Sequence, residues 1–211
     1  MFIATVLSTR GGWIPLIVGA GLCEDFRCAF MVNTDIQDHP DLVPPWNTLK
    51  AWREANHSVR YHLHRYHAHM HNLEPVFLDV KAGMVSIFPI LRDLCENTCP
   101  WCPEPCCLAA MVWFDLPDLL FLHLNQCTPP PAQPKMDLKA TCRYLGPKGC
   151  RLPRISRPWI CTWYLCDSQL ARLRKNGQAA ADAFTASLQS VKKRRKDLES
   201  EFIRIVTQTD L

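Results

Sequence analysis

The sequence predicts a mainly α protein in which a small, irregular, cysteine-rich region is followed by a long C-terminal helix. Ten of the 12 cysteines lie between Cys95 and Cys166, where several prolines interrupt regular structure. Beyond this region, apolar side chains recur every three or four residues, as in an amphipathic helix. We therefore divide the chain into three segments, 1–82, 83–166 and 167–211.

Length and charge allow one ordinary domain with appendages or two small domains. The chain has 211 residues, of which 48% are hydrophobic, so it can form a core. Its 24 basic and 20 acidic side chains give a formal net charge of +4. Because this charge is small, it does not indicate binding to nucleic acid or to an anionic membrane, and we expect no nucleic-acid partner.

The longest apolar run near the N-terminus, from Trp13 to Leu22, is too short to cross a bilayer, which requires about 20 residues in a helix. It is also unlike an export signal, because only Arg10 precedes it as a basic residue and no clean small-residue cleavage site follows. We therefore expect no membrane span and a location in the reducing cytoplasm.

Segment 1–82 is predicted to be weakly structured, rich in histidine and dispensable for folding. It shows no sustained period of 2 or 3.6 residues. One tract holds His57, His62, His64, His67, His69 and His71. If the tract is helical, His64, His67 and His71 share a face and could bind a metal ion. The alternative is a polar leader with no such role.

The first half of the cysteine-rich region is predicted to be an irregular loop. A short apolar stretch, from Met84 to Leu94, leads into it. Its cysteines are Cys95, Cys99, Cys102, Cys106 and Cys107. The intervening prolines exclude a regular helix. After this loop, Asp115 and Pro117 are typical of a helix start, and we expect an apolar core helix on which His123 is packed rather than a ligand.

The second half of the region follows a stiff, proline-rich connector at 128–134. Its cysteines are Cys142, Cys150, Cys161 and Cys166. Turns at Gly146-Pro147 and Gly149 are expected to bring Cys142 and Cys150 together. In a helix, Cys161 and Cys166 would point in different directions, so both cannot bind one ion without a break in that helix.

Two thiol-rich segments separated by an apolar one can supply four soft ligands to Zn²⁺ or to an iron–sulfur cluster. A disulfide framework is the alternative, because the number of cysteines is even, but disulfides require an oxidising compartment. Buried or merely reactive thiols are a third reading. We expect a small, irregular, cysteine-ligated metal module.

The C-terminal segment, 167–211, is predicted to hold two helices. Ser168 is expected to cap a short helix that ends at Asn176-Gly177, and a second helix is expected from about Gln178 to Val206. Its apolar seam consists of Phe184, Leu188, Val191, Leu198, Phe202 and Ile205, interrupted by Arg195. The seam either docks on the protein's own core or forms a coiled coil, so an unknown protein partner and a homodimer are both possible.

The region from Cys95 to Cys166 resembles the YkgJ-type cysteine-cluster family of zinc- or iron-chelating proteins. The family's paired cysteines correspond to Cys106 and Cys107, preceded by Cys99 and Cys102. Its second half corresponds to Cys142, Cys150, the Arg157-Pro158 pair and Cys161. One departure is that three residues, rather than the usual two, separate Cys102 from the pair. The resemblance covers about a third of the chain and extends to bacterial flagellin lysine N-methylases, so an iron–sulfur-dependent protein methyltransferase is an alternative function.

The resemblance implies a metal-chelating module with a structural or electron-related role. Its candidate ligands are Cys95, Cys99, Cys102, Cys106, Cys107, Cys142, Cys150 and Cys161. Flanking aromatic residues that could shield a cluster from solvent are Trp101, Trp113, Phe114, Trp159, Trp163 and Tyr164. Because such shielding slows oxidative loss, we expect an iron–sulfur cluster in preference to zinc.

The spacing of Cys95, Cys99 and Cys102 is also similar to the cluster-binding loop of radical S-adenosylmethionine enzymes. Only 109 residues follow Cys102, however, and they do not show the repeated strand–helix units of such an enzyme. Hydrolysis is not indicated, since the sequence has neither a Gly-x-Ser-x-Gly nor a His-Glu-x-x-His motif.

Overall fold

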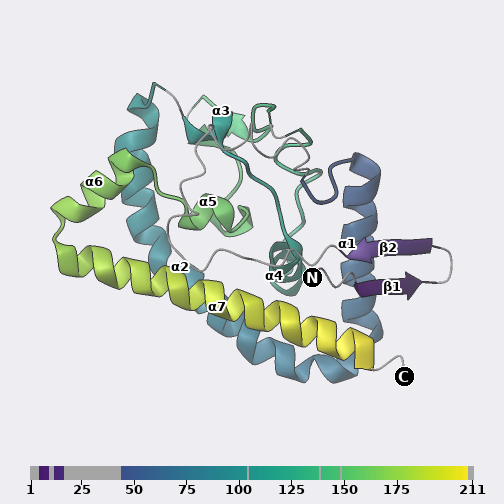
Figure 1. Cartoon of the computed structure of the whole chain (residues 1–211). Helices are drawn as coiled ribbons and strands as arrows, with labels where there is room; N and C mark the ends of the chain where they lie inside the picture. The colour runs from purple at the N-terminus through teal and green to yellow at the C-terminus, as the bar shows by residue number, and fades with distance from the viewer. Residues whose placement is uncertain are drawn as a thin grey trace.

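The computed structural model describes residues 5–9, 12–16, 44–103, 105–137, 139–147 and 149–208. Two strands near the N-terminus, β1 (Thr5–Thr9) and β2 (Gly12–Leu16), pair in antiparallel fashion. Most of the remaining described structure is helical, which confirms the predicted mainly α class with a long C-terminal helix (Figure 1).

The helices occur in the following order. They are α1 (Leu49–Arg65), α2 (Leu73–Thr98), α3 (Cys106–Ala109), α4 (Leu116–Leu124), α5 (Ile160–Trp163), α6 (Asp167–Lys175) and α7 (Gln178–Gln208). Short 3₁₀ turns are η2 (His67–Asn72), η3 (Cys99–Trp101) and η4 (Arg154–Ser156). A small hairpin, β3 (Leu145–Gly146) and β4 (Gly149–Cys150), lies between α4 and α5 in the chain.

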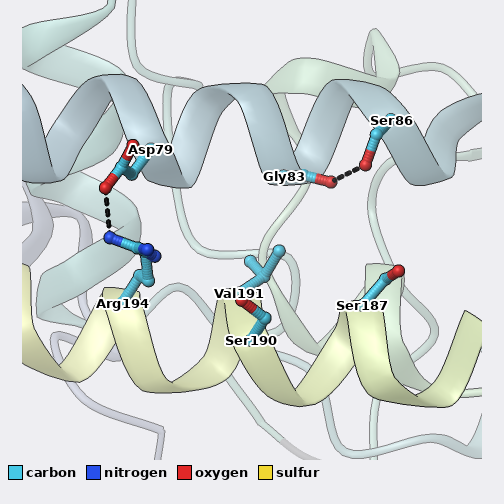
Figure 2. A pocket seen from close by; sticks show the side chains of 7 residues that line it. All are labelled: Asp79, Gly83, Ser86, Ser187, Ser190, Val191 and Arg194. Carbon is cyan, nitrogen blue, oxygen red and sulfur yellow. Dashed lines mark hydrogen bonds and ion pairs between the residues drawn. The ribbon is translucent and has the colours of Figure 1, made fainter. Parts of the chain in front are cut away.

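The long helices α2 and α7 pack against each other in antiparallel fashion (Figure 1). Figure 2 shows the crossing, where Asp79 faces Arg194 and Gly83 faces Val191. A Cβ atom on Gly83 would lie 2.6 Å from Cγ2 of Val191, so the helices approach closely because residue 83 has no side chain.

Helix α2 is much longer than the predicted apolar stretch, which began at Met84. Its buried residues recur every three or four positions, as expected for a helix packed on one face. They are Leu73, Phe77, Val80, Met84, Ile87, Leu91 and Leu94. Pro89 lies inside the helix on its exposed side. The predicted irregular loop therefore begins only after Thr98, and Cys95 belongs to the last turn of α2.

The prediction of a weakly structured segment over 1–82 is wrong for residues 49–82. Helix α1 has a Thr48 cap that accepts the Ala51 N–H (3.1 Å), and it buries Trp52, Ala55 and Val59 in the core. The proposed boundary at residue 82 falls inside α2. The histidines concealed this pattern, because most of them are exposed on α1 and the following turn, although His62 is buried on the same face of α1 as Val59. Residues 1–43, apart from β1 and β2, lie outside the described residues, as do Cys23 and Cys28.

Helix α4 forms the centre of the core, as predicted. Asp115 caps it by accepting the Asp118 N–H (2.8 Å), and Asp118 accepts the Asp115 N–H in return (3.1 Å). All residues from Leu116 to Leu122 are buried. His123 is packed, as expected, with Nε2 3.1 Å from Oδ1 of Asn56 on α1.

The connector at 128–134 packs into the core and is more than a spacer. Gln133 is fully buried. Its side-chain carbonyl accepts the backbone N–H of Phe114 (2.7 Å), and its side-chain amide donates to the backbone carbonyl of Phe114 (3.0 Å). The carbonyl of Pro130 accepts the indole N–H of Trp52 (2.8 Å). The chain between the two cysteine-rich halves is therefore held against α1 and the start of α4.

The predicted C-terminal helices are both present. Helix α6 is capped by Cys166 rather than by Ser168, and it ends at Asn176 with Gly177 at φ 102°, a conformation that glycine adopts readily. Every residue of the predicted α7 seam is buried, and α7 contacts α2, α4 and α6. The seam therefore packs on the protein's own core. In the part of the chain that the structure describes, no helix is both long and apolar enough to cross a membrane.

Candidate metal centre and a second thiol group

The structure sorts most of the predicted ligands into two separate groups. The first, which we call the hairpin group, comprises Cys107, Cys142, Cys150 and Cys161. The second, which we call the helix-end group, comprises Cys95, Cys99 and Cys166. The side chain of Cys106 lies outside the described residues.

The hairpin group joins the two halves of the cysteine-rich region. Cys107 lies on α3, and its carbonyl accepts the backbone N–H of Cys142 (3.1 Å). The chain then turns, with the Leu145 N–H donating to the Cys142 carbonyl (3.0 Å), and enters the β3–β4 hairpin. The hairpin places Cys150 opposite Leu145, and Gly149 makes the turn with φ 98°. The predicted turn that brings Cys142 and Cys150 together is therefore present.

Arg157 and Asp118 hold the chain between Cys150 and Cys161. The Arg157 guanidinium donates to the carbonyls of Leu152 (3.0 Å) and Cys150 (3.4 Å). The backbone N–H of Trp159 donates to Oδ1 of Asp118 on α4 (3.0 Å). Both contacts fix the entry to α5, whose first turn carries Cys161. The Arg157-Pro158 pair thus has a structural role in positioning Cys161.

Electrostatic interactions connect the four thiols of the hairpin group. Burial raises the pKa of Cys161 well above its ordinary value, and the neighbouring Cys107, Cys150 and Cys142 raise it further. Burial also raises the pKa of Cys142, with further increases from Cys107 and Cys150 and an opposing effect of Lys135. The protonated thiols of Cys142 and Cys161 are therefore favoured.

Lys135 places a positive charge beside this group. Its side chain is 1% exposed, and Nζ donates to the carbonyl of Leu108 (3.0 Å). A buried ammonium group is costly unless it is compensated by acceptors or anions. A set of thiolates beside it would supply such compensation.

Among the described residues, no three or more histidine, cysteine, aspartate or glutamate side chains are arranged to hold a metal ion. The predicted face of His64, His67 and His71 is also not arranged in this way, because α1 ends at Arg65 and His67 begins a 3₁₀ turn. The rings of His64 and His67 are 6.4 Å apart. The four thiols of the hairpin group are thus neighbours in the fold rather than an assembled ligand set.

The helix-end group is built differently, around hydrogen-bond donors. Nη2 of Arg154 lies 3.2 Å from Sγ of Cys95. Nε2 of Gln169 lies 3.5 Å from Sγ of Cys95 and 3.7 Å from Sγ of Cys99. Cys166, the N-cap of α6, donates its backbone N–H to Oε1 of Gln169 (3.4 Å), which orients this amide.

These contacts set the thiols of Cys95 and Cys99 far apart in acidity. A hydrogen bond with Cys99 lowers the pKa of Cys95 to about 5, and Arg154 and Arg157 add to this effect while burial opposes it. The same hydrogen bond, burial and the charge on Cys95 raise the pKa of Cys99. These shifts favour the thiolate at Cys95 and the protonated thiol at Cys99.

Two further cysteines belong to neither group. The backbone N–H of Cys102 donates to the Cys99 carbonyl (3.3 Å). Cys127 accepts a hydrogen bond from Nδ2 of Asn125 (3.1 Å). Trp101 beside Cys102 is 82% exposed, so it does not shield any site from solvent as the sequence suggested.

Sequence reasoning missed the polar side chains that position these thiols. They are Arg154, Gln169, Lys135 and Asp118. Only Asp118 had a local signal, because it lies in the predicted helix start. Arg154 and Gln169 are 59 and 74 residues away from Cys95 in the chain, so no local spacing indicates their contact with it.

A buried ion pair stabilises the packing between α4 and α7 near the hairpin group. Arg195, which interrupts the α7 seam, is paired with Asp115 (2.7 Å) and Asp118 (2.9 Å). Its guanidinium also lies 5.4 Å from the ring centroid of Trp159. The interruption of the seam by a basic residue was the signal that could have identified this network.

Comparison of the chain with protein-family models, with curated proteins and with solved structures gave no match. The groove between α2 and α7 in Figure 2, with a volume of about 180 Å³, is lined by small and exposed polar side chains and no cysteine or histidine.

Proposed function

We propose that this protein binds a metal centre through the hairpin group, Cys107, Cys142, Cys150 and Cys161. The observation that carries this proposal is the backbone hydrogen bond from Cys142 to Cys107, which joins the two cysteine-rich halves of the chain. Four cysteines, brought together from α3, a hairpin and α5, are the number of ligands that a tetrahedral zinc or an iron–sulfur cluster requires.

Binding requires the four side chains to rotate toward a common centre and to lose their protons. The free energy of metal binding drives both changes, because thiolates are favoured only when the ion is present. Lys135 and Arg157, which lie beside the group, offset the negative charge that four thiolates bring. Cys106 is adjacent to Cys107 in the chain and is a further candidate ligand.

Of the two candidate cofactors, we propose an iron–sulfur cluster. The donor set consists of sulfur alone, which suits both metals. Trp113, Trp163 and Tyr164 are half-buried near the cysteines in the chain, and Trp159 is buried, so these aromatic residues remain available to limit access of solvent. A cluster would supply one-electron transfer, whereas zinc would supply only structural stability. The role that we propose is thus structural or electron-related, in a reducing cytoplasm.

Anaerobic purification with metal and sulfide analysis tests this proposal. We expect a brown protein that contains iron and acid-labile sulfide and whose visible absorption bleaches on reduction. Cys142→Ser and Cys161→Ser should each lose most of the bound metal. Cys127→Ser is the matched control, because Cys127 is half-buried but lies outside the group, and it should retain full metal content.

The alternatives give distinct results in the same experiment. A colourless protein with stoichiometric zinc and no sulfide would exclude the cluster but retain the cysteine-ligated site. Full metal retention in both Cys142→Ser and Cys161→Ser would exclude the site itself. Loss of metal after replacement of His64 and His67 would instead indicate the histidine tract.

A further inference from the structure

The helix-end group presents two hydrogen-bond donors to a single sulfur atom. Arg154 Nη2 (3.2 Å) and Gln169 Nε2 (3.5 Å) both face Sγ of Cys95, which is a free, half-buried thiol on the last turn of α2. Hydrogen bonds from a guanidinium group are strongest to an anion. A cation beside a thiol favours the thiolate, which is the nucleophilic form.

Arg154 has one donor that the fold does not use. Its Nη1 is buried and has no hydrogen-bond partner in the described structure. A buried donor without an acceptor is costly, so such a group commonly indicates an acceptor that arrives later. An oxygen atom added to the sulfur of Cys95 would lie beside this guanidinium and could accept that hydrogen bond.

We propose that Cys95 is a reactive thiolate that hydroperoxides oxidise, and that Cys99 resolves the product as an intramolecular disulfide. This site uses none of the four cysteines to which we assign the metal. It is therefore a second function of the same chain and does not depend on the first.

The reaction balances with a hydroperoxide as the oxidant. The Cys95 thiolate attacks one peroxide oxygen, an S–O bond forms, the O–O bond breaks, and the departing alkoxide or hydroxide takes a proton from water. Cys95 is then a sulfenic acid. The Cys99 sulfur attacks the Cys95 sulfur, the S–O bond breaks, and water leaves with the proton of the Cys99 thiol. The two cysteines lose two electrons and the peroxide gains two.

Cys99 is well placed to be the resolving thiol. It shares the Gln169 amide donor with Cys95, at 3.7 Å, and the two side chains are hydrogen-bonded to each other. Cys99 is also the C-cap of α2, where the backbone leaves the α-helix for the η3 turn. Because a disulfide requires a defined separation of the two Cα atoms, this break gives the backbone room to adjust.

Arg154 also argues against a metal ion in the helix-end group. A guanidinium group 3.2 Å from the Cys95 sulfur occupies one direction from which an ion would approach, and its charge repels a cation. Oxidation or alkylation of the thiolate does not meet this repulsion, because hydrogen peroxide and iodoacetamide are neutral.

Alkylation of the full-length protein by iodoacetamide, followed by mass spectrometry, tests the first step. We expect Cys95 to react at least about tenfold faster than Cys127 at neutral pH. Cys127 is the internal control, since its sulfur also accepts an N–H, from Asn125 (3.1 Å), but from an uncharged donor. Arg154→Gln should slow Cys95 about tenfold and leave Cys127 unchanged, and Arg154→Lys should restore part of the rate.

One equivalent of hydrogen peroxide, followed by blocking of thiols and peptide mapping, tests the second step. We expect a disulfide between Cys95 and Cys99. Cys99→Ser should instead accumulate a sulfenic acid on Cys95 that dimedone traps, and Cys166→Ser should still form the disulfide. Bound metal should stay stoichiometric in Cys95→Ser.

Three outcomes would overturn the proposal. Equal alkylation rates of Cys95 and Cys127 would show that the thiolate is not activated. A disulfide from Cys95 to Cys166 would exclude Cys99 as the resolving residue. Loss of metal in Cys95→Ser, with retention in Cys142→Ser, would show that the helix-end group is the metal site, and would reject the assignment of the hairpin group at the same time.

Discussion

A basic side chain lies beside each of the two thiol groups. Arg154 contacts Cys95 directly, whereas Lys135 is buried just after the connector and lowers the pKa of Cys142 against the larger effect of burial. Arg154 and Lys135 both lie in stretches whose sequence shows no helix or strand pattern. The identities of the thiols could be predicted, but the charges that distinguish them could not, because those charges come from distant parts of the chain.

The raised pKa of Glu199 on α7 predicts that the stability of the protein depends on pH. Burial raises its pKa to about 7, the nearby Asp115 raises it further, and Arg195 and Lys196 oppose the shift. The folded protein therefore keeps a proton on Glu199 that the unfolded chain loses above its ordinary pKa of 4.5. The free energy of unfolding should fall as the pH rises from about 4.5 through 7.

Glu199→Gln should remove this dependence. We expect the free energy of unfolding of the variant to exceed that of the wild type by about 1–2 kcal/mol at pH 8 and by little at pH 5. The full effect, at about 1.4 kcal/mol per unit of pKa shift, is reduced because Glu199 is partly solvated. Urea unfolding at both pH values measures the difference. Glu201→Gln is the control, because Arg204 lowers the pKa of Glu201, so the change should be small and of opposite sign. An equal increase in the free energy of unfolding at pH 5 and pH 8 would contradict the raised pKa of Glu199.

At the scale of elements, the ion pair between α4 and α7 has a large predicted effect. Arg195→Leu leaves the carboxylate of Asp118 buried, with side chain 6% exposed, and without its cation. Removing one partner of a buried pair costs about 3–5 kcal/mol. Arg194→Leu is the control, because its pair with Asp79 is exposed and contributes less than about 1 kcal/mol.

Denaturant midpoints of the two variants check this prediction. Because Asp118 also accepts the Trp159 N–H, Arg195→Leu/Asp118→Leu removes the stranded charge but leaves that donor unpaired, and we expect only partial recovery. Similar losses in Arg195→Leu and Arg194→Leu would show that the buried pair has no special importance.

The crossing of α2 and α7 is the second element-scale prediction. Gly83→Val places side-chain atoms where Val191 already lies, 2.6 Å from a Cβ, and overpacking typically costs about 1–3 kcal/mol. Ala82→Val is the control on the exposed side of the same helix, where the substitution lowers helix propensity but does not overpack the crossing. Thermal unfolding should show a clear loss for Gly83→Val and a smaller one for Ala82→Val, and Val191→Ala should rescue the first variant but not the second.

The sequence predicted some elements well and missed others for a physical reason. Helix α7 and the start of α4 were predicted, because a 3–4 rhythm and a capping residue are local signals. Helix α1 was missed, since its apolar residues are few and separated by histidines and arginines. The extent of α2 was missed because Pro75, Gly83 and Pro89 suggest breaks, yet they lie at the first turn, at a close crossing and on an exposed side.

At the scale of the whole molecule, α1 and α2 show that residues 44–82 belong to the folded unit. A protein that begins at residue 83 should lack a cooperative unfolding transition, because it loses core residues such as Trp52, Val59, Leu73 and Phe77. Circular dichroism during heating measures this. This prediction replaces the expectation from the sequence that segment 1–82 is dispensable for folding.

A point variant separates this effect from gross truncation. Trp52→Ala removes a side chain that is 2% exposed and its hydrogen bond to Pro130, and we expect a loss of about 3–5 kcal/mol. Leu49→Ala, at a position that is 45% exposed on the same helix, should lose much less. Cooperative unfolding of the 83–211 fragment with unchanged stability of Trp52→Ala would contradict the inclusion of α1.

The close contact of Gly83 with Val191 ties together positions that lie 108 residues apart. That loop contains the whole cysteine-rich region, and residues 137 and 139–141 within it are exposed. Two fragments divided there would each keep one long helix, and the pairing of α2 with α7 would reassemble them. Only Cys107 of the hairpin group would travel with the first fragment. We therefore expect fragments 1–138 and 139–211 to complement each other when co-expressed, with metal bound by the reassembled pair and by neither fragment alone.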